Sequence, residues 1–144
     1  MPANGGRPRA RRWPLVFFRI TVTCEAALAL GQAVLAGSFL SGHYDALSQH
    51  ELNAMLTGTV ATVQLVAAIL LWRPGRGPGW PAIASLVLLV TETVQITVGY
   101  GRELAVHVPL GVVIIAATLL MLVWAWRPAA SRTEGTEGTG QESA

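Results

Sequence analysis

Four long apolar runs dominate the pattern of hydrophobic and polar positions along the chain. Each run is close to the ~20 residues that a helix needs to cross ~30 Å of hydrocarbon. The pattern predicts an all-α, polytopic membrane protein with four transmembrane helices, at about residues 14–40, 50–72, 80–99 and 107–126. The connecting segments are short, so the helices are expected to form a bundle of two tandem hairpins.

The two ends of the chain differ from its apolar middle. Residues 1–13 are rich in Pro, Gly and Arg, and residues 129–144 are acidic and repeat Thr-Glu-Gly. Both compositions are typical of disorder. The sequence therefore predicts one membrane domain, residues 14–128, between two disordered segments. The first apolar run is too long for the apolar region of a signal peptide, and Glu25 interrupts it, so we expect an uncleaved anchor.

Composition supports a membrane protein. Hydrophobic residues make up 52% of the 144 residues, charged residues only 12%, and the mean hydropathy is +0.49. All basic residues are arginine, and the abundant Ala, Gly and Pro are typical of a GC-rich, bacterial genome. The net charge of +2 is too small to indicate a nucleic-acid partner. The expected partner is the lipid bilayer, with a second membrane protein or a second copy of the chain as further candidates.

The arginines predict the orientation in the membrane. Most of them lie before the first run, in the turn between the second and third runs, and after the fourth: Arg7, Arg9, Arg11, Arg12, Arg73, Arg76, Arg127 and Arg132. The two opposite loops hold only Arg102. The positive-inside rule places both termini in the cytoplasm of a multi-pass cell-membrane protein. Arg19, inside the first run, is expected to reach back to that side.

The two halves of the apolar region resemble each other. Glu25 and Glu92 each follow a Trp-Pro pair at the same spacing, and each half ends in Trp-Arg-Pro. This indicates a duplicated hairpin, with the two copies related by a pseudo-twofold axis along the membrane normal. A connecting loop about ten residues longer in the first copy would explain why His50 and His107 are not at equivalent spacings.

His50 and His107 open the second and fourth predicted helices on the outer side of the membrane. Each begins a face of polar or small residues at helical spacing. These faces are His50, Asn53, Thr57, Ala61 and Gln64, and His107, Gly111, Ile114 and Thr118. In a pseudo-twofold bundle the imidazoles would oppose each other and serve as metal ligands, such as the axial ligands of a haem. The alternative is that both are polar caps near the lipid headgroups.

Three further residues bear on the histidine site. Gly111 would let a flat macrocycle approach the backbone, and Arg102 in the outer loop would pair with a propionate. His43 is expected to be a solvated loop residue. A divalent ion held by His43 and His50 with Asp45 or Glu51 is an alternative, although the spacing matches no specific metal motif.

Glu25 and Glu92 are expected near mid-bilayer, about 16 Å from the cytoplasmic interface at ~1.5 Å of rise per residue. Gln32 and Gln95 follow them on the same helix faces. Two interpretations are open. In the first, the polar groups hold the bundle together through hydrogen bonds to Thr57, Thr62 or Gln64. Alternatively, the glutamates serve a proton or cation path. Cys24, the one cysteine, is expected to be a small buried side chain.

A family resemblance rests on a few motifs: Gln32 and Gly37, Gln49-His50-Glu51, Gln95 and Gly99, and His107-Val108-Pro109-Leu110-Gly111. With these motifs, residues 14–128 resemble one four-helix half of the haem A synthase family. The resemblance implies that His50 and His107 are the ligands of haem b. Family members have two such halves, one for the substrate haem and one for a cofactor haem, whereas this chain matches one.

Three functions are compatible with these patterns. The first is a small membrane protein that binds haem b for electron transfer or haem handling. The second is a non-enzymatic scaffold or subunit, and the third is a proton- or ion-coupled transport unit that uses Glu25 and Glu92. No nucleophile–base pair, phosphate loop or hydrolase motif is present in the sequence, so we assign no enzyme activity.

Overall fold

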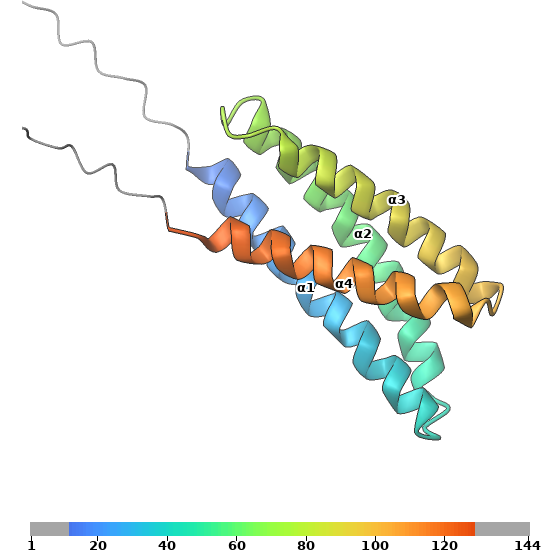
Figure 1. Ribbon diagram of the computed structural model, residues 1–144. Coiled ribbons are helices and arrows are strands. Elements are labelled where there is room, and N and C mark those ends of the chain that lie inside the picture. Colours follow the sequence, from blue (N-terminus) through green and yellow to red (C-terminus); the bar gives the residue numbers. More distant parts are fainter. Residues whose placement is uncertain (1–11, 129–144) are drawn as a thin grey trace, which may run out of the picture.

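The computed structural model describes residues 12–128, which form four α-helices connected by short turns (Figure 1). The helices are α1 (Trp13–Leu40), α2 (Ala46–Trp72), α3 (Trp80–Tyr100) and α4 (Leu104–Trp126). The all-α fold with four helices of membrane-spanning length is as the hydropathy pattern predicts. The predicted disordered segments lie outside the described residues, except that Trp13 already belongs to α1.

Two helices begin earlier than the sequence indicated. α2 begins at Ala46 and α4 at Leu104, so His50 and His107 are the fifth and fourth residues of their helices and do not open them. Backbone bonds account for the difference. The N–H of Ala46 donates to the carbonyl of His43 at 3.0 Å, and that of His107 donates to Glu103 at 2.9 Å. Helical bonding thus continues through polar residues that hydropathy alone assigns to a loop.

The expected long loop in the first hairpin is also wrong. The α1–α2 connection spans residues 41–45 and the α3–α4 connection spans 101–103. The additional length lies mainly in the helices, because α1 has 28 residues whereas α3 has 21. In Figure 1 the end of the first hairpin therefore extends past the end of the second.

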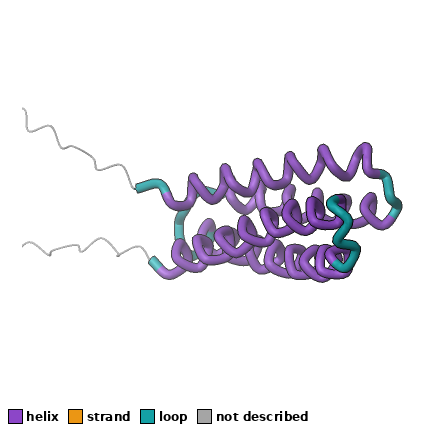
Figure 2. Tube along the Cα trace, turned by 90° about the horizontal axis from the view of Figure 1, so that it is seen from below, coloured by secondary structure: helices purple, strands orange, loops and turns teal. Residues whose placement is uncertain are grey.

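Each helix packs against two neighbours. α1 contacts α2 and α4, and α3 contacts the same two helices, so α1 and α3 lie diagonally opposite, as do α2 and α4. The N-terminus of α1, the C-terminus of α4 and the 73–79 turn share one end of the bundle (Figures 1 and 2). The other two turns lie at the opposite end, where the hairpins diverge. We call these the terminal end and the loop end.

The packed apolar core occupies the terminal half. Its largest side chain, Phe18, is fully buried and lies edge-on to Trp124 at 6.2 Å between ring centroids, and Trp124 in turn meets Trp80 at 4.5 Å. Small side chains such as Ala67 and Ala68 let the helices approach closely. Between lipid-embedded helices, close van der Waals packing of this kind stabilises association.

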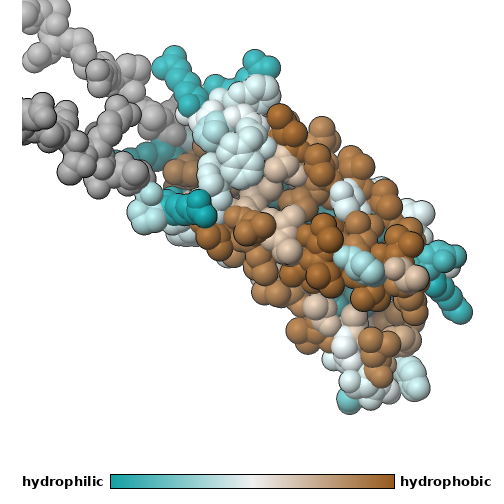
Figure 3. Space-filling view, viewed as in Figure 1, coloured by the Kyte–Doolittle hydropathy of each residue, from teal (hydrophilic) through white to brown (hydrophobic). Residues whose placement is uncertain are grey.

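The outer surface is apolar over the length of the helices. Large aliphatic side chains remain exposed on every helix, for example Val34, Met55, Ile83 and Leu120. Figure 3 shows this apolar surface on one face, with hydrophilic residues gathered toward the two ends. A soluble monomer rarely exposes so large an apolar surface. With four helices long and apolar enough to span a bilayer, the protein is a multi-pass membrane protein.

Arg19 ties α1 to the end of α4. Its Nε donates to the main-chain carbonyl of Ala125 at 2.8 Å, and its guanidinium lies 5.0 Å from the Trp126 ring centroid. The indole of Trp126 then donates to Thr23 Oγ1 at 3.2 Å. Arg19 therefore reaches toward the terminal end, as predicted, and satisfies one of the last carbonyls of a helix C-terminus.

Cys24 is exposed on the outside of the bundle. The expectation that it is a small buried side chain is therefore wrong. Its neighbour Glu25 takes the inward position of this turn, and adjacent residues on a helix point in different directions.

Candidate functional site

A cavity of about 280 Å³ opens in the loop half of the bundle. All four helices line it, and its walls are mostly apolar, with Ile96 of α3 and Ile114 and Ile115 of α4 among them. Few polar residues line it: Gln32, His50, Glu51, Thr57, Glu92, Gln95, Tyr100 and His107. Of these, Glu51 and Tyr100 are exposed. Apolar walls with a few convergent polar groups are typical of small-molecule sites.

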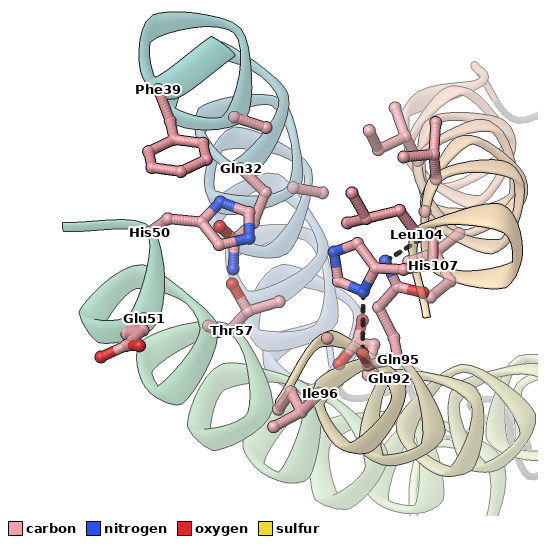
Figure 4. Close-up of a pocket in the computed structure, with 18 of the residues that line it drawn as sticks. Gln32, Phe39, His50, Glu51, Thr57, Glu92, Gln95, Ile96, Leu104 and His107 are labelled. Carbon is pink, nitrogen blue, oxygen red and sulfur yellow. Dashed lines mark hydrogen bonds between the residues drawn. The ribbon is translucent and has the colours of Figure 1, made fainter. Parts of the chain in front are cut away.

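His50 and His107 face each other across this cavity (Figure 4). They come from the diagonally opposite helices α2 and α4, and their ring centroids lie 6.2 Å apart at an interplanar angle of 61°. The inner faces that follow them are also as the spacing predicts, because Thr57, Gln64 and Thr118 are buried. Both rings are half-buried.

Gln95 fixes His107 through two hydrogen bonds. The imidazole Nδ1 lies 3.0 Å from the main-chain oxygen of Gln95, and the side-chain amide of Gln95 donates to the main-chain oxygen of His107 at 2.9 Å. A carbonyl oxygen only accepts, so Nδ1 carries the proton and Nε2 keeps its lone pair. This is the arrangement in which histidines bind metals.

Gln32 holds His50 in a different way. In the amide orientation that satisfies both of its polar atoms, Gln32 donates to Nδ1 of His50 at 2.7 Å and accepts from the N–H of Ala54 at 2.9 Å. Nδ1 of His50 then accepts, and Nε2 carries the proton. The two opposed imidazoles are therefore in different tautomers, although their helices occupy equivalent positions.

Two glycines make room for these contacts. A Cβ at Gly99 would lie 2.9 Å from Cε1 of His107, and a Cβ at Gly111 would lie 2.9 Å from Nε2 of Gln95. Gly111 does line the cavity, but the Gln95 amide occupies the space beside it that we expected a macrocycle to use. Arg102 does not line the cavity. It lies exposed in the adjacent turn with a positive φ of 60°.

Glu25 and Glu92 meet at the inner end of the cavity. They come from the diagonally opposite helices α1 and α3 and are 0% and 4% exposed. Their carboxyl groups are close enough to interact, and Glu92 lines the cavity. Within the described residues, none of the four carboxyl oxygens has a hydrogen-bond partner of good geometry.

The hydrogen bonds expected for the glutamates do not form. The hydroxyl of Thr57 donates to the carbonyl of Asn53, in its own helix, at 2.8 Å. Thr62 is exposed and likewise bonds within α2. Gln64 points into the bundle, but its amide donates to Ser85 Oγ at 3.4 Å and to Met121 Sδ at 3.5 Å. Threonines in a helix commonly bond to the preceding turn, which leaves the carboxyl groups without these donors.

Sequence reasoning missed three inward polar contacts. Ser85 and Met121 complete the layer around Gln64, and Asn53 donates to the main-chain oxygen of Leu28 at 2.9 Å, which links α2 to α1. Asn53 had been placed on the inner face, but its partner is a backbone group. A small polar residue in an apolar helix, as at Ser85, is the signal that could have indicated this layer.

The divalent-ion alternative has no geometric support. Within residues 12–128, no group of three or more His, Cys, Asp or Glu side chains is placed to hold a metal ion. His43 is exposed in the 41–45 turn, which fits the expectation of a solvated loop residue.

Comparisons with protein-family models, curated proteins and solved structures found no match for this chain. Its likeness to one half of the haem A synthase family therefore rests on the motif residues alone. The structure brings Gln32, His50, Gln95, Gly99 and His107 to one cavity. Gly37, by contrast, has open space where a side chain would be.

Proposed function

We propose that this membrane protein binds haem b between His50 and His107, for electron transfer or haem handling. The observation that carries the proposal is the opposition of the two imidazoles across a cavity, with ring centroids 6.2 Å apart. Two metal–nitrogen bonds of about 2 Å, together with the radius of each ring, span about 6 Å. The spacing therefore suits one metal atom between the rings.

The two histidines are not equally ready to bind the iron of a haem. His107 is ready to bind a metal, because the carbonyl of Gln95 holds its Nδ1 proton. His50 can become the second ligand only when the Gln32 amide rotates. Its oxygen then accepts a hydrogen bond from Nδ1 of His50, and Nε2 of His50 is free to bind the metal. The cavity of about 280 Å³ is at the small end for ligand sites. A macrocycle would therefore require the hairpins to separate further at the loop end.

Other residues near the cavity would orient the haem and shield it from water. Iron in haem supplies a one-electron redox couple. Ile96, Ile114 and Ile115 would exclude water from its faces and edges. Arg102, in the turn between the cavity-lining residues Tyr100 and Leu104, would be the residue to pair with a propionate.

We further propose that both termini lie in the cytoplasm of a bacterial cell and that the two hairpins arose by duplication. The arginines of the terminal end support the orientation. The diagonal pairing of Glu25 with Glu92 and of His50 with His107 supports the duplication. Cysteine accessibility from each side of sealed vesicles, with single cysteines placed in the 73–79 and 101–103 turns, tests the orientation.

An absorption spectrum of the purified protein tests haem binding. We expect a Soret band that shifts on reduction and is lost in His107→Ala and in His50→Ala. His43→Ala is the matched control, since His43 is exposed and does not line the cavity. A folded protein that stays colourless when supplied with haem contradicts the proposal and favours a non-enzymatic scaffold.

A further inference from the structure

Several buried side-chain oxygens in the middle of the bundle have no hydrogen-bond partner of good geometry. Six such atoms lie within the described residues: both carboxyl oxygens of Glu25 and of Glu92, and Oε1 of Gln64 and of Gln95. A buried polar atom without a partner is costly, and a charged one more so. Gln95 and Glu92 line the cavity, so a ligand in the cavity can reach the side chains of these two residues.

The arginines of the part of the chain that the structure describes do not approach the carboxyl pair. Arg19 is the one arginine of residues 12–128 that lies well inside a helix, and it is bound to Ala125 and Trp126. Arg73 lies against Trp72 at the terminal end, and Arg102 lies in the turn between α3 and α4. None of these three guanidinium groups is therefore available as the counter-ion of the carboxyl groups.

Charge balance limits a cation at the carboxyl pair to a single positive charge. Two adjacent carboxyl groups away from water cannot both be ionised without a counter-ion, so a cation that binds there takes the place of a proton. A monovalent ion replaces one proton and leaves the other shared between the two carboxyl groups. A divalent ion such as Ca²⁺ takes six to eight oxygen ligands, several of them carboxylates. Within residues 12–128 no third His, Cys, Asp or Glu side chain joins this pair to form a metal-binding group.

The cavity gives access to the carboxyl pair from the loop end. Glu92 faces the cavity in the loop half. On its other side lie the layer of Gln64, Ser85 and Met121 and then the packed core around Phe18. An ion that arrives through the cavity stops at the carboxyl groups.

We propose that Glu25 and Glu92 form a binding site for one small monovalent cation, with Oε1 of Gln95 as a neutral oxygen ligand, filled from the loop end. The site lies deeper than the histidines, because Glu92 is more than two turns from the end of α3 whereas His107 is in the first turn of α4. The inference does not depend on haem binding.

Thermal unfolding of the full-length protein in detergent tests the site. NaCl, KCl or NH₄Cl replaces N-methylglucamine chloride, a large organic cation, at constant ionic strength. We expect at least one small cation to raise the unfolding temperature saturably, since a ligand that binds only the folded state stabilises it. Glu25→Gln and Glu92→Gln should each weaken the apparent affinity by about tenfold or more. Thr62→Val, on the exposed face of α2, is the matched control.

Two further measurements keep the test decisive. If a glutamine variant does not fold, equilibrium binding of radioactive sodium or rubidium to the wild-type protein replaces it. The site is supported if unlabelled small cations displace the bound radioactive ion and N-methylglucamine does not. His50→Ala should lose the haem absorption and keep the cation response, which separates the two proposals. A wild-type protein that distinguishes no small cation from N-methylglucamine overturns the inference, as do glutamine variants that retain full affinity.

Discussion

Gln95 and His107 are joined by two reciprocal hydrogen bonds, one from the imidazole to the Gln95 carbonyl at 3.0 Å and one from the Gln95 amide to the His107 carbonyl at 2.9 Å. This pair connects α3 to the first turn of α4 and sets the tautomer of the imidazole. Because the first bond uses the main chain of Gln95, a side-chain substitution removes only the second.

Gln95→Leu should lower the stability of the bundle without removing the histidine. The main-chain oxygen of His107 loses its side-chain donor, and a typical hydrogen bond contributes about 0.5–1.5 kcal/mol. Chemical or thermal unfolding in detergent measures the change. Gln49→Leu, at an exposed position of α2, should leave stability nearly unchanged. Equal effects of the two substitutions would contradict the role of Gln95.

Gly99→Ala should displace the His107 ring. The new methyl group would lie 2.9 Å from Cε1 of the imidazole, and forcing an atom into a packed site costs about 1–3 kcal/mol. We expect lower thermal stability and, where haem is bound, a changed absorption spectrum. Gly37→Ala provides the contrast, because a Cβ there meets nothing within 4 Å and alanine favours a helix by about 1 kcal/mol. A stabilising effect of both substitutions would be inconsistent with the observed contact.

Arg19→Gln should loosen the terminal end of the bundle. It removes the bond to the Ala125 carbonyl and the contact with Trp126, together worth about 1–3 kcal/mol. Arg73→Gln, which alters only an exposed contact with the neighbouring Trp72, should cost less. Hydrogen exchange at the end of α4 should increase in the first variant and not in the second.

Glu25→Gln should stabilise the protein when small cations are absent. The new amide supplies N–H donors to the oxygens of Glu92, and a hydrogen bond to a charged group contributes about 1.5–3 kcal/mol. A double-mutant cycle with Glu92→Gln should show a coupling of about 0.5 kcal/mol or more, because the two side chains are in contact. Glu103→Gln, at an exposed position that does not line the cavity, serves as the control. Additive effects at positions 25 and 92 would mean that the carboxyl groups do not interact.

The spans of the helices could be predicted because they follow from length, hydropathy and proline placement. α1 and α3 begin at Trp-Pro pairs, where proline suits a first turn. The early starts of α2 and α4 could not be predicted, because backbone bonds from Ala46 and His107 extend the helices through polar residues.

Helical spacing also placed the inward-facing residues of the candidate site correctly, including His50, His107 and the two glutamates. It could not identify their partners. The contacts of Gln95 with His107 and of Gln32 with His50 depend on the axial offset between neighbouring helices. The spacing of residues within a single helix does not specify this offset. The role of Gly111 was misjudged for the same reason, since the Gln95 amide that fills its space comes from α3.

The terminal half of the bundle is packed and the loop half is hollow, and this contrast limits how far an ion can travel along the bundle in this conformation. Below the carboxyl groups the packed core lies across the path from the cavity to the terminal end. A continuous path to that end would require the edge-to-face contacts of Phe18, Trp124 and Trp80 to separate. A disulfide that joins α1 and α4 beside these aromatic residues would hold that end closed and leave the cavity accessible.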